Sequence, residues 1–215
     1  MLMAEIVPTI TAYDLDTYHQ QIGLVRSFAK RIHIDLMDGE FAPTKSPPLK
    51  DVWWPKELRA DLHLMYQRPM DFVDTISHMD PLPELVIVHN EAEVHHMHLA
   101  AELHKADIAV GLAILQDTPV DWIEQIMHSF DHILIFSGNL GHHGGAADLR
   151  LLEKVDYIQQ HHPEVEIGWD GGIQVDNAAK LAQHGVSVLN VGGGIHASDN
   201  PNEAYATLRR SINER

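Results

Sequence analysis

Eight short runs of β-branched and apolar residues recur along the chain at nearly even spacing, and they limit the fold more than any other feature. Eight runs in 215 residues leave about 27 residues for each, the length of a strand with a helix and its connections. We expect strands at 6–10, 31–37, 60–65, 85–89, 108–115, 132–137, 165–169 and 186–191. Apolar residues at helical spacing predict helices at 14–29, 91–104, 119–130, 148–161, 177–184 and 200–212.

This alternation of strands and helices favours a closed (β/α)₈ barrel, also called a TIM barrel. An open doubly wound sheet is the alternative. It usually carries a glycine-rich fingerprint after its first strand, whereas Pro8-Thr9-Ile10-Thr11 contains no glycine. No shift in composition marks a linker, so we expect one α/β domain over residues 1–215.

Charge and composition narrow the range of partners. Acidic residues outnumber basic ones 31 to 15, and the formal net charge is −16 with histidine neutral. Such a field repels nucleic acid and anionic membranes, so an anionic substrate needs a local binding device. The chain has no cysteine, which excludes thiolate chemistry. Its first ten residues do not have the pattern of a signal peptide and no stretch is apolar enough to span a membrane, so we expect a cytoplasmic protein.

Polar residues gather where three of the expected strands end, which is where this fold places its sites. His33 and Asp35 leave the same face of the second strand because they are two residues apart. His63 lies near the end of the third strand and Asp170 near the end of the seventh. A single histidine here is as often a hydrogen-bonded interior residue. Two imidazoles and two carboxylates at three strand ends favour a site for Zn²⁺, Fe²⁺, Mn²⁺ or Co²⁺.

Glycines follow the last three expected strands. They allow backbone N–H groups to approach a phosphate closely, and a helix that begins there adds its positive end. Each group alone also fits a tight turn, but the three groups together favour a phosphate site. The glycines are Gly141, Gly144 and Gly145, then Gly171 and Gly172, then Gly192, Gly193 and Gly194.

The segments HIDLMDGEFAPT, DLHLM, FSGNLGHHGG, WDGGI and VGGGI resemble the ribulose-phosphate 3-epimerase family in order and spacing, over nearly the whole chain. The resemblance implies a TIM barrel of the ribulose-phosphate-binding type that acts on a sugar phosphate. It also implies a divalent metal on His33, Asp35, His63 and Asp170, with the two aspartates as catalytic acid and base. The residues expected to contact substrate are Thr9, His63, Met37, Met65, Gly141, Gly144, Gly171, Gly172, Gly192 and Gly193.

The residue types fit this chemistry without the resemblance. The carbon beside the carbonyl of a ketose phosphate carries an acidic proton, and a metal stabilises the enediolate that its removal leaves. Inversion needs removal on one face and delivery on the other. Asp35 and Asp170 come from well-separated strands and can flank a substrate. Met37 and Met65 would form an apolar wall, although ordinary packing fits them equally well.

Some positions depart from the family pattern and leave the substrate open. Phe136 stands where a methionine is usual, the loop after it carries His142 and His143, and Gly193 replaces a serine. The expected reaction interconverts D-ribulose 5-phosphate and D-xylulose 5-phosphate. The alternatives are epimerisation of a hexulose phosphate and a non-catalytic sugar-phosphate-binding barrel. A Schiff-base aldolase is disfavoured, because no lysine ends an expected strand.

Three further positions carry expectations. His89 ends the fourth strand and is expected to be hydrogen-bonded in the interior, with pocket lining as the alternative. Asp61 points the same way as His63 and needs a buried partner that the sequence does not identify. Trp53 and Trp54 offer exposed aromatic area, so a homo-oligomer is expected.

Overall fold

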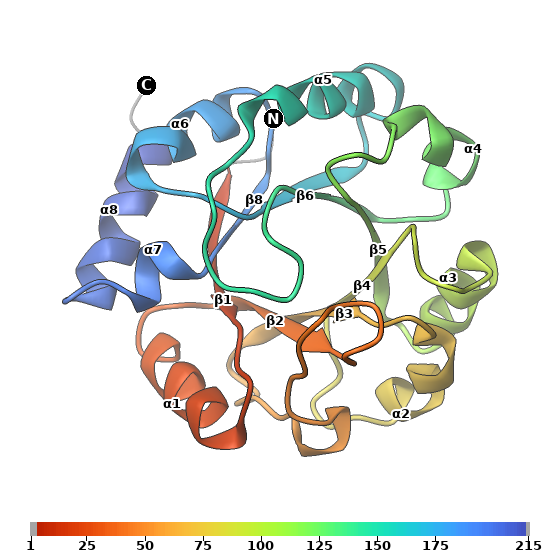
Figure 1. Cartoon of the computed structure of the whole chain (residues 1–215), viewed down its shortest axis with the longest axis horizontal. Coiled ribbons are helices and arrows are strands. Elements are labelled where there is room, and N and C mark those ends of the chain that lie inside the picture. The colour runs from red at the N-terminus through yellow and green to blue at the C-terminus, as the bar shows by residue number, and fades with distance from the viewer. Residues whose placement is uncertain (1–3, 214–215) are drawn as a thin grey trace.

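The computed structural model describes residues 4–213, and these form a closed barrel of eight parallel strands in sequence order (Figure 1). Strand β8 pairs with β1, which closes the barrel, so the TIM-barrel prediction is confirmed and the open sheet is wrong. Residues 1–3, part of the segment examined for a signal peptide, lie outside the described residues. The strands are β1 Glu5–Ile10, β2 Arg31–Met37, β3 Arg59–Met65, β4 Leu85–His89, β5 Ala109–Ile114, β6 His132–Phe136, β7 Glu166–Asp170 and β8 Val188–Val191.

The strands are buried on both faces because helices cover the outside of the barrel and side chains fill the inside. All seven residues of β2 and all five of β4 are buried. Helices surround the barrel in Figure 1. They are α1 Leu15–Val25, α2 Val73–Ser77, α3 His96–His104, α4 Glu124–Met127, α5 Leu152–His161, α6 Val175–Gln183, α7 Gly193–His196 and α8 Pro201–Asn213.

Four of the expected helices, at 14–29, 91–104, 119–130 and 148–161, are shorter in the structure. The stretch 119–130 holds a 3₁₀ turn, Val120–Ile123, followed by the single turn of α4, because only Ile123 and Met127 of these two elements are buried against the barrel. The helix expected at 91–104 begins only at His96. Two short helices had no counterpart in the sequence analysis: α2, and α7 within the glycine run after β8.

Strand register brings the polar strand ends to one level. Asp35 on β2 lies opposite His63 on β3, and Asp170 on β7 lies opposite Asn190 on β8. Neighbours in register point their side chains to the same face of the sheet. The carboxyl ends of these strands therefore present their polar groups to one end of the barrel interior.

The opposite end of the barrel is closed by a buried charge cluster. Asp61 accepts from Nε of Arg31 at 2.8 Å, and the other two guanidinium nitrogens donate to Glu166 at 3.1 and 3.0 Å. Nδ1 of His132 lies 2.8 Å from the same Glu166 carboxylate. Burial raises the pKa of Asp61 to about 7, even though the adjacent Arg31 favours its ionised form. Arg31 is the partner that the sequence left unidentified.

Of the two tryptophans expected to be exposed, only Trp53 is. Trp53 is 48% exposed, but Trp54 is 2% exposed and belongs to the hydrophobic core, so the prediction of an exposed pair is wrong for Trp54. The homo-oligomer that rested on it stays a prediction. Among residues 4–213 we find no helix that combines the length and the apolar character needed to cross a bilayer.

Candidate active site

The structure brings His33, Asp35, His63 and Asp170 together in one buried cluster. One ligating atom from each lies within 4.8 Å of all the others. Nε2 of His33 lies 3.3 Å from Asp35 and 3.7 Å from Asp170, and Nδ1 of His63 lies 2.9 and 3.7 Å from the same two carboxylates. The four residues that the sequence singled out as metal ligands thus share one site.

This donor set fits a divalent metal ion. Nε2 of His33 is fully buried and has no hydrogen-bond partner, although it is directed at two carboxylates. Burial lowers the pKa of His33 to about 4, so the imidazole is neutral at physiological pH, which is the form that binds metals. Two imidazole nitrogens and two carboxylate oxygens suit Zn²⁺, Fe²⁺, Mn²⁺ or Co²⁺.

The two aspartates are electrostatically unequal. Burial alone would raise the pKa of Asp35, but the hydrogen bond with His63 and the nearby imidazole of His33 outweigh it and hold that pKa well below its usual range. Burial and the nearby charge of Asp35 raise the pKa of Asp170 well above its usual range. The surroundings of these two buried carboxyl groups thus favour the ionised form of Asp35 and the protonated form of Asp170.

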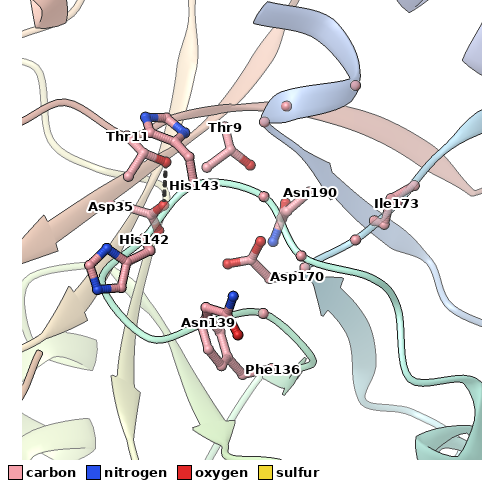
Figure 2. A pocket seen from close by; sticks show the side chains of 18 of the residues that line it. Thr9, Thr11, Asp35, Phe136, Asn139, His142, His143, Asp170, Ile173 and Asn190 are labelled. Carbon is pink, nitrogen blue, oxygen red and sulfur yellow. Dashed lines mark hydrogen bonds between the residues drawn. The ribbon is translucent and has the colours of Figure 1, made fainter. Parts of the chain in front are cut away.

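Asp35 also accepts a hydrogen bond that the sequence analysis missed. Oγ1 of Thr11 donates to its second carboxylate oxygen at 2.7 Å, as Figure 2 shows. Thr11 follows Thr9 by two residues just beyond the end of β1, so the period of a strand was a signal that could have found it. The bond fixes the rotamer of Asp35 and favours its ionised form.

A chain of buried polar groups runs from His63 away from the cluster. Nε2 of His63 lies 2.9 Å from Nε2 of His89, and Nδ1 of His89 lies 3.5 Å from a carboxylate oxygen of Glu91. His89 is fully buried, as expected of an interior hydrogen-bonded residue, and does not line the pocket. The other ring nitrogen of His63 faces the two aspartates, so the contact with His89 sets the orientation and tautomer of the His63 ring.

Glu91, at the outer end of this row of polar side chains, is hydrogen-bonded to the loop after β5. Glu91 accepts from the hydroxyl of Thr118 and, at 3.1 Å, from the backbone N–H of Leu115. The ammonium of Lys154 donates to the carbonyl oxygens of Leu115, Gln116 and Thr118 at 2.8 to 2.9 Å. Lys154 is thus committed to the loop backbone and is not available as an imine-forming residue.

A pocket opens beside the aspartates and is lined largely by glycine (Figure 2). Within residues 4–213, its lining includes no lysine or arginine. An anion in the pocket must therefore be held by backbone N–H groups, hydroxyls, side-chain amides or imidazoles. The glycines that line it include all six of those expected to contact substrate: Gly141, Gly144, Gly171, Gly172, Gly192 and Gly193.

The glycines after β7 leave no space for a side chain, whereas Gly193 after β8 does. Gly171 has φ +109°, and a Cβ there would lie 2.1 Å from the backbone nitrogen of Gly138. Gly172 has φ +70°, and its Cβ would lie 2.0 Å from the backbone nitrogen of Ala147. Both positions need glycine because the loop after β6 packs against them. A Cβ at Gly193 would meet nothing within 4 Å, so this backbone is bare toward the pocket.

The loop 137–148 lies across the opening of the barrel in Figure 1. Its Gly141 carbonyl accepts from the hydroxyl of Thr44 at 2.5 Å and from that of Tyr13 at 3.3 Å. Exposed His142 and His143 extend from this loop and line the pocket. The loop thus forms one wall of the pocket and is tied to the segments that follow β1 and β2.

The remaining expected contact residues differ in position. Thr9 and Met65 line the pocket, together with Phe136. Met37 packs with Met65 and Ala42 in a small hydrophobic cluster and does not line the pocket. His63 is fully buried within the metal cluster and is likewise absent from the pocket lining.

A TIM barrel with four candidate metal ligands beside a glycine-lined pocket, at the carboxyl ends of its strands, belongs to the class of barrel enzymes that act on phosphorylated substrates. The model of the ribulose-phosphate 3 epimerase family matches residues 5–196, and the chain belongs to this family. It is therefore an isomerase of the epimerase type.

Curated relatives agree with this family. The ribulose-phosphate 3-epimerase of Schizosaccharomyces pombe is 26% identical over 99% of this chain and 95% of its own length. That of Bacillus subtilis is 26% identical over 97% of this chain and 100% of its own length.

Solved structures are similar in fold. A 3-hexulose-6-phosphate synthase has a TM-score of 0.71 at 14% identity, with 97% of this chain and 99% of that chain covered. A Mycobacterium tuberculosis tryptophan synthase chain also has a TM-score of 0.71, at 13% identity, with 99% and 94% covered. At such identities the likeness concerns the barrel alone.

Proposed function

We propose that the chain catalyses the metal-dependent interconversion of D-ribulose 5-phosphate and D-xylulose 5-phosphate. The observation that carries the proposal is the cluster of His33, Asp35, His63 and Asp170 within 4.8 Å, next to the glycine-lined pocket. Membership of the epimerase family supports a sugar phosphate as the substrate class.

The four clustered side chains would hold the metal. When bound, a divalent cation supplies Lewis-acid charge that stabilises an enediolate. Asp35 and His63 are fixed by the hydroxyl of Thr11 and by His89, so neither needs to rearrange when substrate arrives. The burial of both imidazoles excludes water from the ligands.

The proton transfers fall to the two aspartates. Asp35 lies on β2 and Asp170 on β7, on different sides of the barrel interior, and both line the pocket. One carboxylate removes the proton at C3 from one face of the sugar, and the other, as a carboxylic acid, delivers a proton to the opposite face. Inversion of the centre follows, and proton exchange of both aspartates with solvent restores the original protonation before the next forward turnover.

The pocket wall supplies the remaining contacts. The phosphate lies against the backbone of Gly141, Gly144, Gly171, Gly172, Gly192 and Gly193, which fits the lack of lysine and arginine among the described lining residues. Met65 offers apolar surface beside the reacting carbons, backed by Met37. Thr9 offers a hydroxyl at the strand end nearest this backbone.

Solvent isotope exchange tests this function. The protein, loaded in turn with Zn²⁺, Fe²⁺, Mn²⁺ and Co²⁺, is incubated with D-ribulose 5-phosphate in D₂O. We expect xylulose 5-phosphate that carries deuterium at C3, and Asp35→Asn and Asp170→Asn should each slow its formation at least about 10³-fold. Asp121→Asn, which removes an exposed carboxylate outside the pocket, is the control. Absence of exchange with pentulose and hexulose phosphates alike would refute the function.

A further inference from the structure

A buried amide without partners faces the pocket beside Asp170. Asn190 is 2% exposed, and neither its Nδ2 nor its Oδ1 has a hydrogen-bond partner. Oγ1 of Thr9, 3% exposed, is likewise unpaired. Both residues line the pocket, and in Figure 2 their side chains lie around the same space as the Asp170 carboxylate.

Strand geometry places Asn190 between the acid–base pair and the glycine backbone. On β8 it is in register with Asp170 on β7, and Gly192 follows it by two residues. On the other side it is in register with Val7 of β1, two residues before Thr9. Residues two apart on a strand share a face, so Asn190 and Thr9 both point into the barrel.

These atoms call for a partner from within the pocket. Buried polar side chains are nearly always hydrogen-bonded, and each exception needs an explanation. The amide offers both a donor and an acceptor, and the threonine hydroxyl offers the same pair. Neither side chain carries a charge, so the two suit a neutral group that donates and accepts. A sugar hydroxyl both donates and accepts, whereas a phosphate dianion only accepts and would leave Oδ1 of Asn190 unpaired, and a metal ion would leave its Nδ2 unpaired.

We propose that Asn190 and Thr9 form a subsite for a hydroxyl group on the carbon chain between the reacting carbon and the phosphate. The proposal rests on the proposed function, since that function places the reacting carbon at the aspartates and the phosphate at the glycines. In a pentulose 5-phosphate the hydroxyl is the one on C4. The subsite selects ketose phosphates that bear this hydroxyl over deoxy analogues.

A substrate pair that differs at this one group tests the subsite. D-ribulose 5-phosphate is compared with its 4-deoxy analogue by kcat/KM on the metal-loaded enzyme. We expect the wild type to prefer the hydroxylated sugar by roughly 10- to 100-fold, since a site built around a hydroxyl disfavours a substrate without it. Asn190→Leu, which keeps the size and removes both polar ends, should reduce the preference to about threefold or less, and Thr9→Val should reduce it partly.

Controls separate the subsite from general damage. Val191→Ala alters the next residue of β8, which faces the other side of the strand into the core, and should leave the preference unchanged. The affinity for inorganic phosphate should not change in Asn190→Leu. An undiminished preference in both Asn190→Leu and Thr9→Val overturns the proposal and leaves the amide as a site for water. If Asn190→Leu does not fold, the isosteric Thr9→Val decides alone.

Binding measurements keep this test independent of turnover. If the wild type epimerises neither sugar, the proposed function fails. Titration calorimetry of the two sugars with wild type and Thr9→Val still decides the subsite. Equal affinity of the wild type for both sugars would then refute it, and a loss of selectivity in the variant would support it.

Discussion

At the scale of single residues, the site depends on how each ligand's second polar atom is used. Asp35 turns one oxygen to the histidines and the other to Thr11, and His63 turns one nitrogen to the aspartates and the other to His89. A histidine whose outer nitrogen is fixed presents its inner nitrogen in one tautomer and one orientation. His89 is thus a positioning residue that acts on the metal cluster through His63.

Replacement of His89 should weaken metal binding more than it weakens folding. We expect His89→Leu to lower the affinity for Zn²⁺ or Co²⁺ by roughly 10- to 100-fold, because His63 loses the contact that orients it. His89→Gln, which keeps a polar end near the same place, should recover part of the loss. Competition with a chromophoric chelator measures the affinity. His98→Gln, on the exposed surface of α3, is the matched control, and an affinity loss no larger in His89→Leu than in this control would contradict the positioning role.

The sequence made the clustered residues predictable because of where they stand. Asp170 ends β7, and His33, Asp35 and His63 lie two to four residues before the ends of β2 and β3. The apolar runs of these strands are easily recognised, and the ends of parallel strands meet at one end of a barrel. Asn190 gave no comparable indication. It is a single polar residue within an apolar run, and only the register between β7 and β8 places it beside Asp170.

At the scale of elements, the fit between β6 and β7 depends on one missing side chain. Gly168 leaves room for the imidazole of His132: a Cβ at this position would lie 2.4 Å from Nε2 of that ring and 2.9 Å from Cδ1 of Leu134. The ring is also held by Glu166 at the start of β7. The strand pair therefore has no space for even one added methyl group.

Gly168→Ala should consequently destabilise the protein by about 1–3 kcal/mol, since overpacking a close-packed interior forces neighbours to shift. Urea denaturation measures the change. Gly23→Ala provides the opposite case, because Gly23 lies exposed within α1 and a Cβ there meets nothing within 4 Å. That change should stabilise the protein by about 0.5–1 kcal/mol. Equal effects of the two substitutions would show that the packing argument is wrong.

Elements were predictable to different degrees for a physical reason. The strands carry continuous apolar runs because both of their faces are buried, so their positions could be recognised within one or two residues. The helices contact the barrel on one side only. Where that contact shrinks to one turn, as at Ile123 and Met127, the pattern in the sequence no longer fixes the length of the helix.

At the scale of the whole molecule, we expect metal binding to be coupled to folding. The four ligands come from β2, β3 and β7, and they meet only in the folded chain. Metal at about 100 times its dissociation constant should therefore add about 2.7 kcal/mol to the free energy of unfolding. For a chain of this size we expect the Tm to rise by roughly 5–10 °C, and chelator to reverse the rise. His33→Gln should reduce the shift, and a full shift in this variant would place the metal elsewhere.

The charge cluster at the other end of the barrel predicts a dependence of stability on pH. Burial lowers the pKa of His132, so as pH falls below about 6.5 the unfolded chain takes up a proton that the folded chain does not. The wild type thus loses stability on acidification through this group. His132→Gln lacks that loss and can still donate to Glu166.

We expect His132→Gln to be less stable than the wild type by about 2 kcal/mol at pH 7.5, because it packs and hydrogen-bonds less well. The deficit should shrink by about 1–2 kcal/mol at pH 5. Urea denaturation of both proteins at several pH values measures it. A deficit that stays constant or grows toward pH 5 would mean that His132 titrates normally in the folded state.

The buried charge cluster also closes the amino-terminal end of the barrel interior. Arg31, Asp61 and His132 fill the end away from the glycine loops and are almost wholly shielded from solvent. The pocket is consequently closed at its inner end. We expect a sugar phosphate to enter and leave at the outer end, past residues 137–148. Under the proposed function, substrate and product share this opening and this pocket, so we expect the product to inhibit the forward reaction competitively.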